Sequence, residues 1–125
     1  MIEIHPLREQ DKLVRLYDSS DISFCENSMA VVASDKDEIL GFCLFEMNDD
    51  NILVHALEPR DDVYFADGIL RSALHVGVEN GKQSAFYSEK APENLFEALK
   101  FVKNKDTKEL DVGKLFSSCG SCANS

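Results

Sequence analysis

Two of the four cysteines in this chain have a spacing that could do chemistry. Cys119 and Cys122 form a Cys-x-x-Cys motif near the C-terminus. Two thiols at this spacing can chelate one metal ion or form a local disulfide. The motif alone leaves three interpretations open: a reduced C-terminal tail, a zinc site, and a redox or crosslinking site.

A zinc site at this motif would need more ligands. Structural zinc has four, and the sequence holds no second Cys-x-x-Cys. Cys25 could be the third ligand, and His5, His55 or His75 the fourth. A site shared between two chains would also reach four ligands, and would make the protein a homodimer. Cys43 stands within an apolar run, so we predict a small core residue there.

The net charge of the chain limits the classes of partner that it is expected to bind. Its 125 residues include 13 basic and 23 acidic ones, for a net charge of −10. Like charges repel, so we expect neither nucleic acid nor an anionic membrane surface as a partner. A basic partner would suit the charge, although acidity also serves solubility.

Length and hydropathy indicate one domain. We expect it to span residues 1–118, followed by a cysteine-containing tail over residues 119–125. The first residues carry acids and no apolar core, unlike a signal peptide. No apolar run approaches the roughly 20 residues of a membrane span. We therefore expect a cytoplasmic protein, in which thiols stay reduced.

The apolar pattern predicts alternating strands and helices. Polar turns at residues 35–38 and 48–51 join three apolar runs, which is typical of an antiparallel meander. After Pro59 the period becomes helical, and Asp61 and Asp62 are good helix N-cap residues. Strands are expected over residues 2–5, 29–33, 39–47, 52–57, 84–87 and 109–112, and helices over 7–17, 63–79 and 93–101. The order β-α-β-β-β-α-β-α-β predicts an α/β (α+β) fold with a mixed sheet.

Residues 89–102, with the sequence EKAPENLFEALKFV, carry a family resemblance. They resemble the late segment N-x-x-A-x-x-L-Y-E-K-x-G-F of GNAT acyltransferases, with Leu95, Glu97, Leu99 and Phe101 on matching positions. The order of elements resembles that superfamily over nearly the whole chain, except that one helix precedes the second strand where two are usual. The resemblance implies a central mixed, mostly antiparallel sheet flanked by helices.

The resemblance also implies an acyl-CoA site at the start of the central helix. GNAT proteins place Arg/Gln-x-x-Gly-x-Gly/Ala there, after a strand that ends in proline. With one residue inserted, Ala66 and Gly68 match small positions of this motif. The expected contacts with acetyl-CoA or another acyl-CoA are those of Leu57, Ala66, Asp67, Gly68 and Ile69.

The loop before this helix departs from the family pattern. With the usual spacing after the proline, Asp62 takes the Arg/Gln position, and with the inserted residue Val63 takes it, so neither alignment supplies the arginine or glutamine. Asp61, Asp62 and Asp67 lie where phosphates would bind. A carboxylate at a helix N-terminus competes for the N–H groups that a phosphate would use. We expect the helix to be capped by its own acids, with weak or no CoA binding.

Catalytic residues follow from the same resemblance. GNAT proteins often use a glutamate on the central strands to deprotonate the acceptor amine. Glu58 is the predicted base, with Glu46 and His55 as other candidates; each could equally be a polar residue on an outer strand face. Phe96 takes the position of the usual proton-donating tyrosine and has no hydroxyl. Tyr87 is the predicted substitute, unless it is a partly buried aromatic with its hydroxyl already bonded.

The sequence is consistent with two functions. The first is an acyl-CoA-dependent N-acyltransferase acting on a small amine or peptide. The second is a GNAT-like binding or regulatory module without acyl transfer, linked to metal through Cys119 and Cys122. The first requires an open groove between strands 52–57 and 84–87, not filled by Tyr64, Phe65 or Phe96. Motifs of hydrolases, P-loop NTPases and zincins are absent from the sequence.

Overall fold

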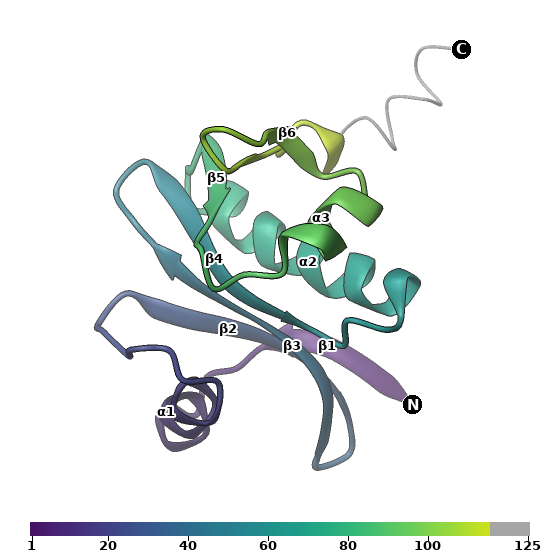
Figure 1. Ribbon diagram of the computed structural model, residues 1–125. Coiled ribbons are helices and arrows are strands. Elements are labelled where there is room, and N and C mark those ends of the chain that lie inside the picture. The colour runs from purple at the N-terminus through teal and green to yellow at the C-terminus, as the bar shows by residue number, and fades with distance from the viewer. Residues whose placement is uncertain (116–125) are drawn as a thin grey trace.

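The computed structural model describes residues 1–115, which form three helices around one sheet (Figure 1). The strands are β1 (Ile2–Pro6), β2 (Ser28–Asp35), β3 (Glu38–Met47), β4 (Asn51–Glu58), β5 (Ser84–Tyr87), β6 (Val102–Asn104) and β7 (Glu109–Leu110). The helices are α1 (Gln10–Ser19), α2 (Val63–Glu79) and α3 (Glu93–Ala98).

The sheet has the order β1-β2-β3-β4-β5-β7-β6. Its neighbouring strands are antiparallel except for β4 and β5, which are parallel. α1 covers one face, and α2 and α3 cover the other (Figure 1). The predicted mixed, mostly antiparallel sheet flanked by helices is confirmed.

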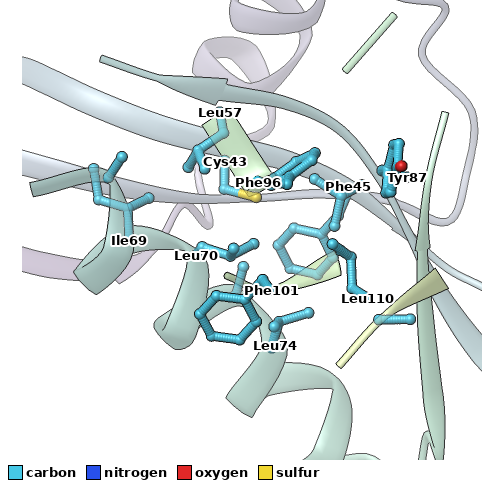
Figure 2. Packing of buried hydrophobic residues seen from close by; sticks show 14 of the residues in the cluster. Cys43, Phe45, Leu57, Ile69, Leu70, Leu74, Tyr87, Phe96, Phe101 and Leu110 are labelled. Carbon is cyan, nitrogen blue, oxygen red and sulfur yellow. The ribbon is translucent and has the colours of Figure 1, made fainter. Parts of the chain in front are cut away.

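Alternating side chains of the meander build two cores. On β2 and β3, Val31 and Cys43 face α2, whereas Val32 and Leu44 face α1. The larger core joins β3 and β4 to α2 and α3 (Figure 2). Cys43 is fully buried within it, as predicted from its apolar run. The central strands are therefore buried on both faces, and this holds their polar side chains in fixed positions.

β4 carries a bulge next to the point where its pairing with β5 ends. Leu44 pairs with Ala56 and Phe45 with Val54, so β4 has one extra residue, His55, at this point. A bulge bends and twists the strand that carries it. β5 stays paired to β4 only as far as Val54. Beyond that residue the edge of β4 that faces β5 lies open, and the opening positions the candidate site.

The region after α2 differs in detail from the sequence prediction. α3 ends at Ala98, short of the predicted residue 101, because Lys100 adopts the left-handed conformation (φ 63°) that ends many helices. Lys100 takes a position where the related motif has glycine, which reaches this conformation without steric cost. Two short strands, β6 and β7, replace the single predicted one. Among residues 1–115, no helix is long and apolar enough to cross a membrane.

Candidate active site

Three polar side chains meet on the α1 face of the sheet, beside the opening between β4 and β5. Glu46 comes from β3, His55 from the bulge in β4, and Ser88 from the residue after β5. His55 Nδ1 lies 3.0 Å from Ser88 Oγ, and His55 Nε2 is hydrogen-bonded to Glu46 Oε2. The side chains of His55 and Glu46 are 14% and 23% exposed. The cluster is thus half-buried but accessible.

These residues line a pocket of about 460 Å³. Its other lining residues are Ile22, Ser23, Cys25, Glu89 and Lys90. Cys25 Sγ lies 3.5 Å from Glu46 Oε1. Lys90 Nζ donates a hydrogen bond to the carbonyl oxygen of Asp21, at 2.5 Å. That bond ties the loop after α1 to the turn after β5, so the pocket has walls from both halves of the chain.

A second hollow lies on the opposite face, between the start of α2 and the start of α3. It has a volume of about 590 Å³ and is lined by Arg60, Val63, residues 91–95 and Ala98. Phe96 does not line it, because its ring is fully buried, with its centroid 5.2 Å from that of Tyr87. Tyr64 is 92% exposed and does not line this hollow, which we call the groove. No residue of β4 or β5 lines it, so it is not the gap between those strands that the sequence prediction required.

Tyr87, a predicted catalytic residue, belongs to the core under α3 (Figure 2). Its hydroxyl donates a hydrogen bond to Glu93 Oε2 at 2.6 Å, and Glu93 lines the groove. Burial, and then the bond to the Glu93 carboxylate, raise the pKa of the Tyr87 phenol to about 12. The hydroxyl is therefore protonated at neutral pH and already bonded, as in the alternative of a buried aromatic with its hydroxyl satisfied.

Glu58, the other predicted catalytic residue, ends β4 apart from the cluster. Its Oε2 lies 3.0 Å from Arg60 Nε, and its side chain is 37% exposed. It is not among the residues that line the polar pocket. The structure therefore brings the two alternative candidates, Glu46 and His55, together and places Glu58 elsewhere. Ser88 was not predicted, since a lone serine after a short strand carries no signal in the sequence.

The start of α2 is capped by an acid, as predicted. Asp62 is the N-cap residue, and its Oδ1 accepts a hydrogen bond from the Phe65 N–H at 3.1 Å. The Ala66 N–H donates to the Asp62 carbonyl oxygen at 2.9 Å, as the helix requires. The predicted cofactor-binding amides from residue 66 onward thus lie past the first turn. In the first turn of the helix, the N–H groups of Val63 and Tyr64 have no partner within the helix.

The remaining predicted cofactor residues are held by other contacts. Leu57, Ala66 and Ile69 are fully buried in the larger core. The carboxylate of Asp67 pairs with Arg71 along the helix, at 2.8 Å. A Cβ added to Gly68 would lie 3.6 Å from the Ile4 side chain, so this glycine faces β1. Leu57 is registered opposite Cys43 of β3 and lies past Val54, where the pairing of β4 with β5 has ended.

The predicted metal ligands Cys119 and Cys122 lie outside the described residues. Within residues 1–115, no group of three or more His, Cys, Asp or Glu side chains could hold a metal ion. Cys25 lies beside Glu46 in the polar pocket, and His55 is bonded within the cluster. The geometry of the described residues lends the zinc interpretation no support.

No family model matches the sequence, and no curated protein matches it. Solved structures do match. An acetyltransferase of the GNAT family from Desulfovibrio desulfuricans has a TM-score of 0.57 and 16% identity, over 81% of this chain and 85% of that chain. The ribosomal-protein-S18-alanine N-acetyltransferase from Escherichia coli has a TM-score of 0.57 and 12% identity, over 87% and 88%. A tandem GNAT protein from the clavulanic acid biosynthesis pathway has a TM-score of 0.58 and 10% identity, over 84% and 45%.

Proposed function

Because the chain has the fold of GNAT acetyltransferases, we propose that it is an acyl-CoA-dependent N-acyltransferase acting on a small amine or peptide. The observation that carries the proposal is the opening past Val54. The pocket with a paired histidine and carboxylate lies beside this opening on one face of the sheet, and the groove at the starts of α2 and α3 lies on the other face. In the proposal, the amine occupies the polar pocket, the acyl-CoA occupies the groove, and they meet in the opening.

His55 is the general base of this proposal. An amine is largely protonated at neutral pH and must lose a proton to attack an acyl carbon. Glu46 holds one ring nitrogen of His55 and would stabilise the imidazolium that forms. His55 Nδ1 takes the proton, through the Ser88 hydroxyl that it contacts. Such general-base catalysis contributes about 10²–10⁴-fold. Glu58, predicted from the resemblance, is the second candidate base.

Tyr87 is the proposed acid. Its ring packs against Phe96, which takes the position of the usual tyrosine in the related motif. A hydroxyl from β5 thus lies next to the place where α3 lacks one. Its raised pKa keeps it protonated, so it can give a proton to a departing thiolate once Glu93 releases it.

The cofactor, acetyl-CoA or another acyl-CoA, would be held weakly. The first-turn N–H groups of Val63 and Tyr64 and the open backbone edge at Leu57 can receive it. Arg60 lines the groove, but its Nε pairs with Glu58. Asp62 already occupies one N–H group at the helix start and repels phosphate. We therefore propose an affinity weaker than micromolar.

The Asp62 cap also favours a second function, a GNAT-like binding or regulatory module without acyl transfer. A helix start that is closed by its own carboxylate needs no anion. In this alternative the polar pocket binds a small cationic ligand, and no acyl group moves.

Calorimetry with acetyl-CoA, followed by chromatographic detection of CoA released with a panel of amines, separates the two functions. The transferase predicts measurable binding and amine-dependent release. Binding of an amine with no release favours the module. Absence of acetyl-CoA binding at millimolar concentration would contradict the transferase.

A further inference from the structure

Glu46, His55 and Ser88 form an unbroken line of hydrogen bonds in the polar pocket. Ser88 Oγ contacts one ring nitrogen of His55 at 3.0 Å, and Glu46 Oε2 contacts the other. The three residues come from β3, from β4 and from the position directly after β5. A hydroxyl, an imidazole and a carboxylate in this order are the parts of a serine nucleophile, its base and the group that orients the base.

The chemistry of the carboxylate fixes the role of each ring nitrogen. An ionised carboxylate can only accept hydrogen bonds, so His55 Nε2 carries the hydrogen that is donated to Glu46. In the neutral ring, Nδ1 then has the free lone pair and accepts from the Ser88 hydroxyl. His55 is thus oriented to remove the proton of Ser88, which is what makes a serine nucleophilic.

We propose that Ser88 is a nucleophile and that the protein hydrolyses small acyl esters or thioesters through an acyl-serine intermediate. This activity goes beyond the proposed N-acyltransferase, since it needs neither CoA nor an amine. It uses the same His55 and Glu46, and adds a covalent role for Ser88.

The steps balance with water as the co-reactant. Ser88 Oγ bonds to the acyl carbon while its proton moves to His55 Nδ1. The bond from that carbon to the ester oxygen or thioester sulfur then breaks, and His55 returns the proton to the leaving alcohol or thiol. Water attacks the acyl-serine, its proton passes to His55 and on to Ser88 Oγ, and the carboxylic acid leaves. Glu46 stays ionised and stabilises the imidazolium in both halves.

The rest of the pocket fits a short acyl group. Its volume of about 460 Å³ and the side chain of Ile22 provide a small, partly apolar space. The Lys90 ammonium has three donors, of which one reaches the carbonyl oxygen of Asp21. The others can bind the oxyanion that develops on the acyl oxygen, where a correctly placed donor is worth about 10²–10³-fold in rate.

The test is p-nitrophenyl acetate hydrolysis by the full chain, without CoA. Ser88→Ala and His55→Gln should each lower the rate by about 10²–10⁴-fold. The matched control is Ser84→Ala, a serine of β5 that does not line the pocket, and it should keep the wild-type rate. A fluorophosphonate reagent should label the wild-type protein on Ser88, located by peptide mass mapping, and should fail to label His55→Gln.

A fluorophosphonate label found on Cys25 or Lys90 instead of Ser88 would overturn the proposal, as would equal rates for wild type and Ser88→Ala. Circular dichroism of Ser88→Ala checks that the fold persists. It should, because the Ser88 backbone N–H still donates to the Val54 carbonyl oxygen. Calorimetry with acetyl-CoA and the amine-dependent release of CoA test the proposed N-acyltransferase separately, so failure of either activity is visible without the other.

Discussion

At the scale of single residues, the position of His55 depends on one extra residue in β4. Between the pairs Leu44–Ala56 and Phe45–Val54, β3 advances by one residue and β4 by two, and His55 is the additional residue. Bulges often re-aim a side chain next to an active site. Here the result is an imidazole held between a serine and a carboxylate, the arrangement on which the proposed role of His55 as base rests.

Replacing His55 by glutamine should abolish most acyl transfer. The amide fills similar space but cannot take a proton, so we expect kcat to fall by about 10²–10⁴-fold. The Kd for acetyl-CoA should not change, because His55 lines the other face of the sheet. His75→Gln, on the exposed face of α2, is the matched control. An unchanged kcat in His55→Gln would transfer the role of base to Glu58.

Tyr87 should make stability depend on pH in the alkaline range. Burial raises the pKa of its phenol from about 10 in the unfolded chain to about 12 in the folded one. Between these values the unfolded state loses the proton first, so the stabilisation is complete below pH 10 and disappears as pH rises towards 12. The difference in unfolding free energy between wild type and Tyr87→Phe should therefore decrease from pH 9 to pH 11.5.

Urea titrations at several pH values measure this difference. The same series on Tyr64→Phe measures how stability changes when an exposed phenol hydroxyl is removed. A constant gap between wild type and Tyr87→Phe across the range would show that the hydroxyl is not buried as described.

At the scale of elements, the Asp62 cap at the start of α2 should stabilise the fold and weaken the proposed binding of acyl-CoA. Asp62→Ser keeps an N-cap oxygen but removes the charge, so we expect little change in stability and tighter binding of acetyl-CoA. Asp62→Ala removes both, and should cost about 0.5–2 kcal/mol of stability while also tightening binding. Thermal unfolding and calorimetry measure the two effects. Equal affinity in wild type and both variants would mean that the groove is not the phosphate site.

The close packing of α2 on β4 depends on Gly77. A Cβ added to Gly77 would lie 2.5 Å from Ile52 Cγ1 and closer still to its Cδ1. Ile52 is fully buried, so it has no room to move away. Gly77→Ala should destabilise the protein by about 1–3 kcal/mol.

Gly68→Ala, on the same helix, is the matched comparison. Its new Cβ would make ordinary contact with Ile4, and alanine favours a helix by up to about 1 kcal/mol over glycine. We expect a gain in stability, read by urea unfolding. A loss of stability in this variant would argue against the packing of α2 beside β1.

At the scale of the whole molecule, the net charge of −10 acts on both proposed substrates. It attracts a cationic amine and repels an anionic acyl-CoA, and salt screens both effects. Raising ionic strength from about 0.05 M to about 0.5 M should raise KM for the amine several-fold while KM for acetyl-CoA stays level or falls. A rise in both constants would point to a locally cationic cofactor site.

The elements were predictable because their signals are local. Apolar alternation, polar turns and the Asp62 cap lie within a few residues of the structure they specify, so the meander, α2 and β5 follow from the sequence. β6 did not, since three residues with mostly exposed side chains show no alternation. The likeness of residues 89–102 to a GNAT segment pointed to the fold that the solved structures confirm.

The sequence by itself thus determined the fold class and the residue types available for chemistry. Only the tertiary structure decided which of them meet. Glu46 and His55 were candidates beside Glu58, and Ser88 had no signal at all. Their contact depends on the register between β3 and β4, on one bulged residue, and on where β5 parts from β4. Those are pairings between distant segments, and a shift of one residue would turn each side chain to the opposite face.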